Sequence, residues 1–248
     1  MLPDDQVDRA LAVFAHPDDI DFGAAGTVAR WVEAGTKVTY AVVTDGDAGG
    51  FDPAVAREEI PRIRRAEQQE AAAELGVSEV VFLGYPDGRL SPSLDLRRDI
   101  ARLVRQVRPQ RVLTQSPLRN LDRIYASHPD HLATGEATLC AVYPDARNQF
   151  AHPELAAEGL AAHVVPEVWL MGGPPEGQWA DSVGYGMVAV DVTDVVDRKL
   201  AALRRHVSQM VEIDDLSGMI KGWLGSVAAA AGLPDGRLAE AFRVVDTR

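Results

Sequence analysis

Several features that mark secreted or membrane proteins are scarce or absent in this sequence. There is one cysteine among 248 residues, which excludes an internal disulfide and favours a reducing compartment. No apolar run reaches the roughly 18 residues that a transmembrane helix needs. Residues 1–10 are acidic and lack a basic segment followed by an apolar one. We therefore expect no signal peptide and a cytoplasmic protein.

Positive charge is also in short supply. The chain has 25 Lys and Arg residues against 37 Asp and Glu residues, a formal net charge of −12. An acidic surface repels phosphate groups and anionic lipid heads, so we expect neither a nucleic acid nor a membrane as partner. The composition, 46% hydrophobic and 25% charged, is that of an ordinary globular protein. We expect a single domain over residues 1–248 that acts on a small molecule.

Apolar, β-branched runs alternate with helical patterns along the chain. This order predicts an α/β fold of βαβ units, a Rossmann-like and mainly parallel sheet flanked by helices. We expect residues 144–186 to form irregular connections near the entrance of the site, interrupted by one strand. The predicted strands are 11–15, 38–44, 80–83, 111–115, 166–171 and 187–192, and the predicted helices are 26–34, 57–75, 94–107, 130–143, 194–210 and 216–231.

Unusual polar residues follow each of the first four predicted strands. Ligands of open α/β sheets bind beyond the carboxyl ends of the strands. Those ends here carry His16–Asp19, Asp45–Gly50, Asp87 and, shortly after the fourth strand, His128–His131. The sequence therefore predicts that these four segments meet at one edge of the sheet.

The segment His16–Asp19 places one imidazole and two carboxylates in a stiff turn. Pro17 fixes its own φ and restricts the residue before it. His16 and Asp19 can then converge on one ion while Asp18 points elsewhere. The alternative is an ordinary capped turn before a helix, which would need neither the histidine nor adjacent carboxylates.

A second cluster, Ser127–His131, supplies two histidines three residues apart at the start of a predicted helix. Such residues can face the same space. Catalytic zinc usually takes three protein ligands and leaves the fourth position to water, so His16, Asp19 and one of these histidines would complete a site. Ferrous iron fits the same ligands. The alternative is a helix start with solvent-facing histidines.

The order and spacing of the two clusters resemble the LmbE-like, or PIG-L, family of N-acetylglucosaminyl deacetylases. Its members also include deacetylases and amidases of mycothiol and bacillithiol metabolism. The resemblance covers most of the chain and implies a zinc-dependent deacetylase of an amino sugar, with a homo-oligomer, trimeric or hexameric, as in relatives. Further matching segments are Thr44–Gly46, Arg64–Val77, Leu83–Gly88 and Lys199–Gln209.

The resemblance also implies a role for each residue of the two clusters. His16, Asp19 and His131 would bind zinc, Asp18 would act as general base, and His128 would assist the oxyanion or the leaving group. These roles suit amide hydrolysis, because zinc polarises a carbonyl and lowers the pKa of bound water to about 7.

Four further residues each allow two interpretations. Arg64, Asp87 and Asp47 would contact the sugar by the same resemblance, although Arg64 could be a solvated helix residue and the aspartates could be turn residues. Asp130 could hydrogen-bond a histidine ring and fix its tautomer, or cap the helix.

Two departures from the family pattern bear on the substrate. Ile20 follows the first cluster where many relatives have Glu, and Ala126 stands where mycothiol-type deacetylases have Tyr, with Tyr125 one residue earlier. The mycothiol-precursor assignment is therefore weakened. An amidase that cleaves a thiol conjugate or another non-sugar amide is the main alternative. A nucleotide-binding protein is a third reading, based on Asp21–Gly26, which lacks the first glycine of the dinucleotide fingerprint.

Overall fold

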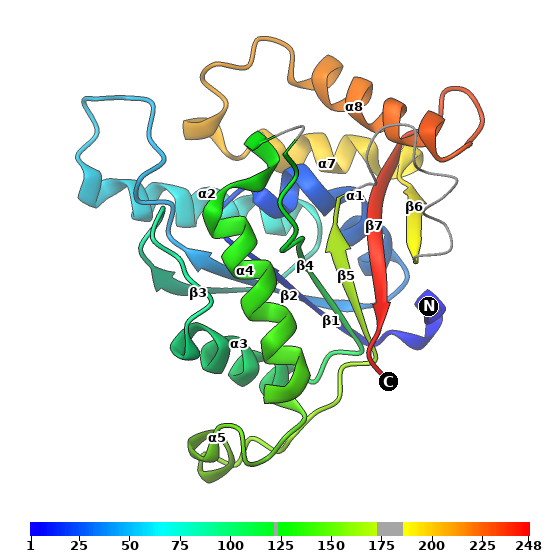
Figure 1. The fold of residues 1–248 in the computed structure, drawn as a ribbon. Helices are drawn as coiled ribbons and strands as arrows, with labels where there is room; N and C mark the ends of the chain where they lie inside the picture. Colours follow the sequence, from blue (N-terminus) through cyan, green and yellow to red (C-terminus); the bar gives the residue numbers. More distant parts are fainter. Residues whose placement is uncertain (122–123, 173–185) are drawn as a thin grey trace.

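The computed structural model describes residues 1–121, 124–172 and 186–248. Its sheet has seven strands in the order β3-β2-β1-β4-β5-β7-β6 (Figure 1). The first five are parallel, and β7 is antiparallel to both of its neighbours. The strands are β1 (Arg9–Phe14), β2 (Lys37–Thr44), β3 (Glu79–Tyr85), β4 (Arg111–Gln115), β5 (Glu167–Met171), β6 (Met187–Asp191) and β7 (Ala239–Asp246). The helices include α1 (Asp19–Glu33), α2 (Ile60–Glu74), α3 (Leu94–Val107), α4 (Pro129–Cys140), α5 (Pro153–Ala157), α7 (Val196–Leu203) and α8 (Leu216–Ala230).

Helices cover both faces of this sheet, which confirms the predicted single-domain α/β fold. The alternation of side chains along β1 shows why. Ala10, Ala12 and Phe14 pack with α1, α2, α7 and α8, whereas Leu11 and Val13 pack with α3 and α4 on the other face. A strand that is buried on both faces reads as a continuous apolar run, which is the pattern that the sequence shows.

Helix α1 begins at Asp19, seven residues before the predicted start at Gly26. The two glycines inside it serve close packing. A Cβ at Gly23 would lie 1.7 Å from Met171 Sδ, and one at Gly26 would lie 2.7 Å from Val192 Cβ. The segment 21–26 is thus a helix interior packed against the sheet, and not the phosphate-binding loop of the nucleotide reading.

Strand β7 was not predicted from the sequence. It lies between β5 and β6, and its Glu240 is buried. Lys199 Nζ lies 2.7 Å from Glu240 Oε1, and the backbone N–H groups of Gly26 and Thr27 also donate to this carboxylate. A glutamate inside an apolar stretch argues against a buried strand unless such partners are known.

Residues 144–165 do not lie at the carboxyl edge of the sheet, which corrects the expectation that they shape the site entrance. Arg105, in the last turn of α3, donates to the backbone oxygens of Asp145 and Asn148, each at 2.9 Å. His163 Nε2 lies 2.8 Å from Pro109 O, just before β4 begins. Residues 144–165, which include α5, therefore cover the opposite edge of the sheet (Figure 1).

Residues 173–185, the later part of the predicted entrance, lie outside the described residues. Within the described part of the chain, no helix is long and apolar enough to cross a membrane.

Candidate metal centre and active site

The turn His16–Asp19 leaves β1 and starts α1 at the carboxyl edge of the sheet. Asp18 has a φ of 92°, a value that residues with a Cβ adopt at a cost of about 1–3 kcal/mol and only when their surroundings hold them there. The carbonyl oxygen of Asp18 accepts the N–H groups of Asp21 and Phe22, which begins the helix. The strained turn thus presents the two adjacent carboxylates in different directions.

The structure brings together the three residues predicted to bind zinc. His16 Nδ1 lies 3.2 Å from Asp19 Oδ2, and His131 Nε2 lies 3.0 Å from Asp19 Oδ1. Burial of Asp19 opposes its ionisation, but the two imidazoles outweigh this effect and hold its pKa well below the usual value. The Asp19 carboxylate therefore lies between the imidazole nitrogens of His16 and His131.

A second group of carboxylates surrounds the other side of the His16 ring. Nε2 of His16 lies 3.0 Å from Asp87 Oδ1 and 3.3 Å from Asp130 Oδ2. Burial alone would lower the pKa of His16, but the nearby carboxylates raise it to about 12. Asp130 is itself held by the N–H groups of Gly88 and Leu90, at 2.7 and 3.1 Å. Asp130 therefore contacts the His16 ring, as expected if its role is to fix the tautomer of a histidine.

These donors fit a divalent cation. Nitrogen atoms of His16, His128 and His131 lie within 4.8 Å of one another, and so do donor atoms of His16, Asp87 and Asp130. Imidazole nitrogens and carboxylate oxygens are the ligands that zinc takes in catalytic sites. Several buried carboxylates around one imidazole also form a surplus of negative charge that a cation would balance.

His128 stands at the start of α4 and faces the other two histidines. Its ring centroid lies 4.9 Å from that of His16 and 5.3 Å from that of His131. The backbone N–H of Asp130 donates to His128 Nδ1 at 3.2 Å. Nδ1 therefore carries no proton in this arrangement, and a neutral His128 has its hydrogen on Nε2. Burial, followed by the charge of His16, lowers the pKa of His128.

Arg64 points into the protein toward the Asp18 turn. Its guanidinium donates to Pro17 O at 2.6 Å, to Gly46 O at 3.2 Å and to Asp18 Oδ2 at 3.1 Å. Glycines make room for it, since a Cβ at Gly46 or Gly49 would lie 2.2 or 2.4 Å from its Nη1. Arg64 is 4% exposed, which rules out the solvated-helix reading and gives it a structural partner in Asp18.

The carboxylate of Asp18 is also shaped by this environment. Burial raises its pKa to about 6, against the opposing effect of Arg64.

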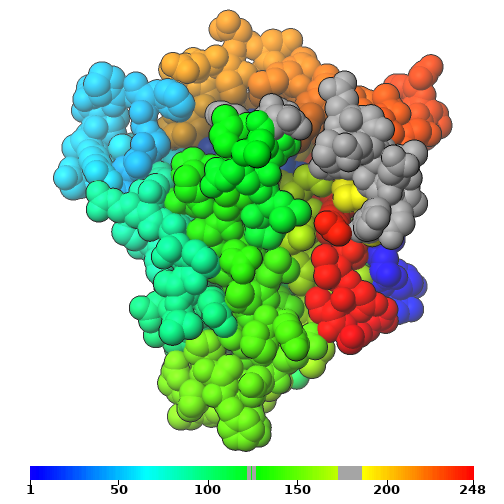
Figure 2. Space-filling view, viewed as in Figure 1, coloured from blue at the N-terminus to red at the C-terminus, as the bar shows by residue number. Residues whose placement is uncertain are grey.

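Asp47 lies at the rim of the site, in the segment that follows β2. Its Oδ2 pairs with Arg57 at 2.6 Å, and its Oδ1 accepts the N–H of Asp87 at 2.8 Å. Figure 2 shows this segment, in light blue, beside the green segment that leads into α4 on the same part of the surface. Of the three residues predicted to contact a sugar, Asp47 is the most exposed, and Arg64 and Asp87 are buried.

One residue of the site was missed in the sequence. Gln115 Nε2 donates to Asp19 Oδ2 at 3.0 Å, and Gln115 Oε1 accepts the N–H of Ala15 at the same distance. It is the last residue of β4, so the strand-end argument that found the other residues would have found it too. The side chains of Tyr125 and Ala126 lie outside the described residues.

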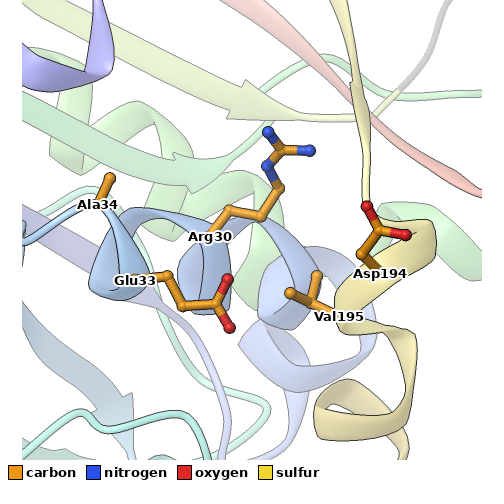
Figure 3. Close-up of a pocket in the computed structure, with 5 residues that line it drawn as sticks. All are labelled: Arg30, Glu33, Ala34, Asp194 and Val195. Carbon is orange, nitrogen blue, oxygen red and sulfur yellow. The ribbon is translucent and has the colours of Figure 1, made fainter.

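A cavity of about 340 Å³ lies at the far end of α1, away from these residues (Figure 3). Two of its three charged side chains have partners among the described residues. Arg30 donates to Asp191 O at 2.6 Å, and Glu33 pairs with Arg198 at 2.8 Å.

Comparisons with known proteins agree with this geometry. The chain is 31% identical to a diacetylchitobiose deacetylase of Thermococcus kodakarensis, over 98% of this chain and 85% of that protein. It is 33% identical to a probable N-acetyl-alpha-D-glucosaminyl L-malate deacetylase 2 of Bacillus anthracis, over 81% of each. Both relatives are deacetylases, which hydrolyse amides.

Solved structures show the same fold. The N,N'-diacetylchitobiose deacetylase of Pyrococcus horikoshii superposes with a TM-score of 0.85 at 26% identity, covering 98% of this chain and 86% of that one. The family model described as GlcNAc-PI de-N-acetylase matches residues 11–142, from β1 to just past α4. The chain is thus an enzyme of the hydrolase class and belongs to the PIG-L, or LmbE-like, family of deacetylases.

Proposed function

We propose that this protein is a zinc-dependent hydrolase that removes the acetyl group from an N-acetylated amino sugar of the N-acetylglucosamine type, or from its conjugate. The observation that carries the proposal is the meeting of His16, Asp19 and His131, with the carboxylate of Asp18 in the same turn. The names of the relatives support the substrate class, because diacetylchitobiose and the glucosaminyl malate share this sugar.

His16, Asp19 and His131 would hold the zinc ion. When bound, zinc would polarise the amide carbonyl and lower the pKa of water to about 7. Asp18 is the proposed general base, which takes a proton from the attacking water. The guanidinium of Arg64 fixes one of its carboxylate oxygens and leaves the other available. General base catalysis of this kind contributes roughly 10²–10⁴-fold.

His128 is the proposed partner of the negative charge that develops on the carbonyl oxygen. Its Nδ1 is occupied by the N–H of Asp130, so the hydrogen on Nε2 is the one available for donation. A donor that is already oriented stabilises such a charge without reorganising during the reaction.

Substrate recognition is assigned to the rim. Asp47 is the proposed sugar contact, because its carboxylate is the more accessible one and a charged hydrogen bond to a hydroxyl is stronger than a neutral one. Arg64 and Asp87 would reach a sugar only by exchanging their present partners. We propose that they act mainly by holding Asp18 and His16.

The test is acetate release from a panel of substrates. The panel contains N-acetylglucosamine, diacetylchitobiose, glucosaminyl malate and glucosaminyl inositol in their N-acetylated forms, and N-acyl cysteinyl amides. We expect release from at least one sugar, its loss after chelation, its return with zinc, and its loss in Asp18→Asn. Asp214→Asn, which changes an exposed aspartate remote in sequence from both clusters, is the control.

Two results would contradict the proposal. Cleavage of the cysteinyl amides alone would favour the amidase reading. Activity that persists after complete removal of metal, verified by elemental analysis, would exclude metal dependence. The same analysis of the purified protein decides between zinc and iron.

A further inference from the structure

The turn that carries Asp18 is anchored by a side chain that lies outside the proposed zinc ligands. The backbone N–H of Asp18 donates to Gln68 Oε1 at 2.8 Å. Gln68 is fully buried on α2, one helical turn beyond Arg64, which donates to the carboxylate of the same Asp18. Helix α2 therefore holds both the backbone and the carboxylate of a residue whose φ is 92°.

The anchor continues deeper into the protein. Gln68 Nε2 donates to Asp21 Oδ2 at 2.7 Å, and His206 Nε2 lies 2.8 Å from the same oxygen. All three side chains are fully buried. They come from α2, from α1 and from the segment after α7, three elements that lie together on one face of the sheet (Figure 1).

Chemistry fixes the direction of both hydrogen bonds that Gln68 makes. The N–H of Asp18 is a donor, so Gln68 must turn its amide oxygen toward it and its NH₂ toward Asp21. Asp21 Oδ2 accepts the hydrogen bond from Gln68, and it accepts a second one from His206 when the imidazole carries a hydrogen on Nε2. Exchanging a donor for an acceptor at any one position would therefore place two donors or two acceptors against each other.

We propose that His206, Asp21 and Gln68 form a positioning chain that holds Asp18 in the orientation needed for catalysis; this inference rests on the proposed function, in which Asp18 is the base. Among the described residues, no hydrogen bond joins Gln68 or His206 to a proposed zinc ligand. The positioning chain therefore acts through Asp18 and not through the proposed zinc ligands.

A purely packing role does not account for these residue types. Burying a carboxylate, an amide and an imidazole is costly unless each is hydrogen-bonded, and apolar side chains would fill the same space at lower cost. The series ends at Asp18, which among the described residues of the site is the one with a positive φ that is not a glycine.

The test is a swap of polarity. Gln68→Glu places a carboxylate against Asp21, so at about pH 8, where both groups ionise in water, the contact is repulsive. Adding Asp21→Asn replaces this repulsion with a hydrogen bond in the opposite direction. The Asn amide can then donate to Glu at position 68 and to His206 in its other tautomer, while the second Glu oxygen accepts the N–H of Asp18. Gln68→Met removes both hydrogen bonds at a similar size.

We expect kcat to fall about 10²-fold in Gln68→Glu and in Gln68→Met, the loss that a small misplacement of a catalytic group produces. KM and zinc affinity, measured by chelator competition, should stay within about twofold, and the double variant should recover most of kcat. His163→Asn, which removes a half-buried hydrogen bond at the opposite edge of the sheet, is the control for loss of stability alone.

The inference is overturned if the single variants keep kcat, if kcat falls only in proportion to the folded fraction, or if the double variant recovers nothing. An inactive wild-type protein would instead overturn the proposed function. In that case crystal structures of wild type and Gln68→Met decide the inference, which requires the Asp18 turn to leave its positive φ in the variant. An unchanged turn contradicts it.

Discussion

His16 Nε2 lies 3.0 Å from Asp87 Oδ1, and both side chains are buried. His16 turns its other nitrogen, Nδ1, toward Asp19. A carboxylate that accepts a hydrogen from one nitrogen of a ligating histidine fixes the tautomer and strengthens the other nitrogen as a donor. In the proposed zinc site, the contact with Asp87 would therefore strengthen His16 as a ligand.

We predict that Asp87→Ala weakens zinc binding by about 10–100-fold, the usual effect of removing such a partner. Chelator competition measures this directly. Asp45→Ala is the matched control, because Asp45 lies in the neighbouring strand-end segment and pairs with Arg65 instead. Wild-type zinc affinity together with a raised KM in Asp87→Ala would show the direct sugar contact that the family resemblance implies.

Gly46 and Gly35 both have positive φ, +62° and +96°, but only Gly46 adjoins the site. A Cβ at Gly46 would displace the buried Arg64 guanidinium, whereas a Cβ at Gly35 would meet nothing within 4 Å. Each Ala substitution should cost about 1 kcal/mol of backbone strain.

We predict that Gly46→Ala loses about 1–3 kcal/mol more than Gly35→Ala and also lowers kcat, because Arg64 then releases Asp18. Urea unfolding and acetate release measure the two effects. Equal loss of stability and equal activity in both variants would show that Arg64 does not depend on the space at Gly46.

The pairing of His206 with Asp21 should make stability depend on pH. Burial acts to lower the pKa of His206, but the hydrogen bond and the charge of Asp21 raise it above the usual value of 6.5. The folded protein then binds this proton more tightly than the unfolded chain does. The contribution of the pair is therefore complete below pH 6.5 and is lost as pH rises through the raised pKa.

Urea unfolding of wild type and His206→Gln, from about pH 6 to about pH 9, measures this contribution. The glutamine can donate a hydrogen bond but does not titrate, and the other groups are common to both proteins. The difference in the free energy of unfolding should shrink as pH rises. A constant difference would mean that folding does not shift the pKa of His206, and a growing difference would mean that folding lowers it; either result contradicts the prediction.

The fold could be predicted from the sequence as far as it depends on local patterns. β4 and α3 were predicted with the boundaries that the structure shows, because an apolar run and a regular helical period are local signals. β7 was missed because its Glu240 is buried against Lys199, a pairing that no local pattern reveals. The predicted helix 194–210 instead ends at Leu203, where the chain turns so that His206 meets Asp21.

The candidate site, too, could be predicted only as far as it depends on local motifs. The proposed zinc ligands could be identified because His16 and Asp19 directly follow β1 and His131 lies in the segment that follows β4, and neighbouring parallel strands bring such ends together. The choice of His131 over His128 came from the family resemblance. The contact of Asp87 with His16 depends on how the segments after β1 and β3 fold over the sheet edge, which the sequence does not show. Asp87 was instead interpreted as a sugar contact, by the family resemblance, or as a turn residue. Gln68 has the i, i+4 spacing from Arg64 that would place both on one helix face, a usable signal.

The central claim is that one divalent cation binds between His16, Asp19 and His131. Anomalous diffraction at the zinc edge from crystals soaked in zinc tests it most directly. We predict a single peak about 2.0–2.2 Å from one atom of each residue, with a fourth position open. A peak held by His16, Asp87 and Asp130, or no peak beside a His131 ring turned away from Asp19, would contradict the account.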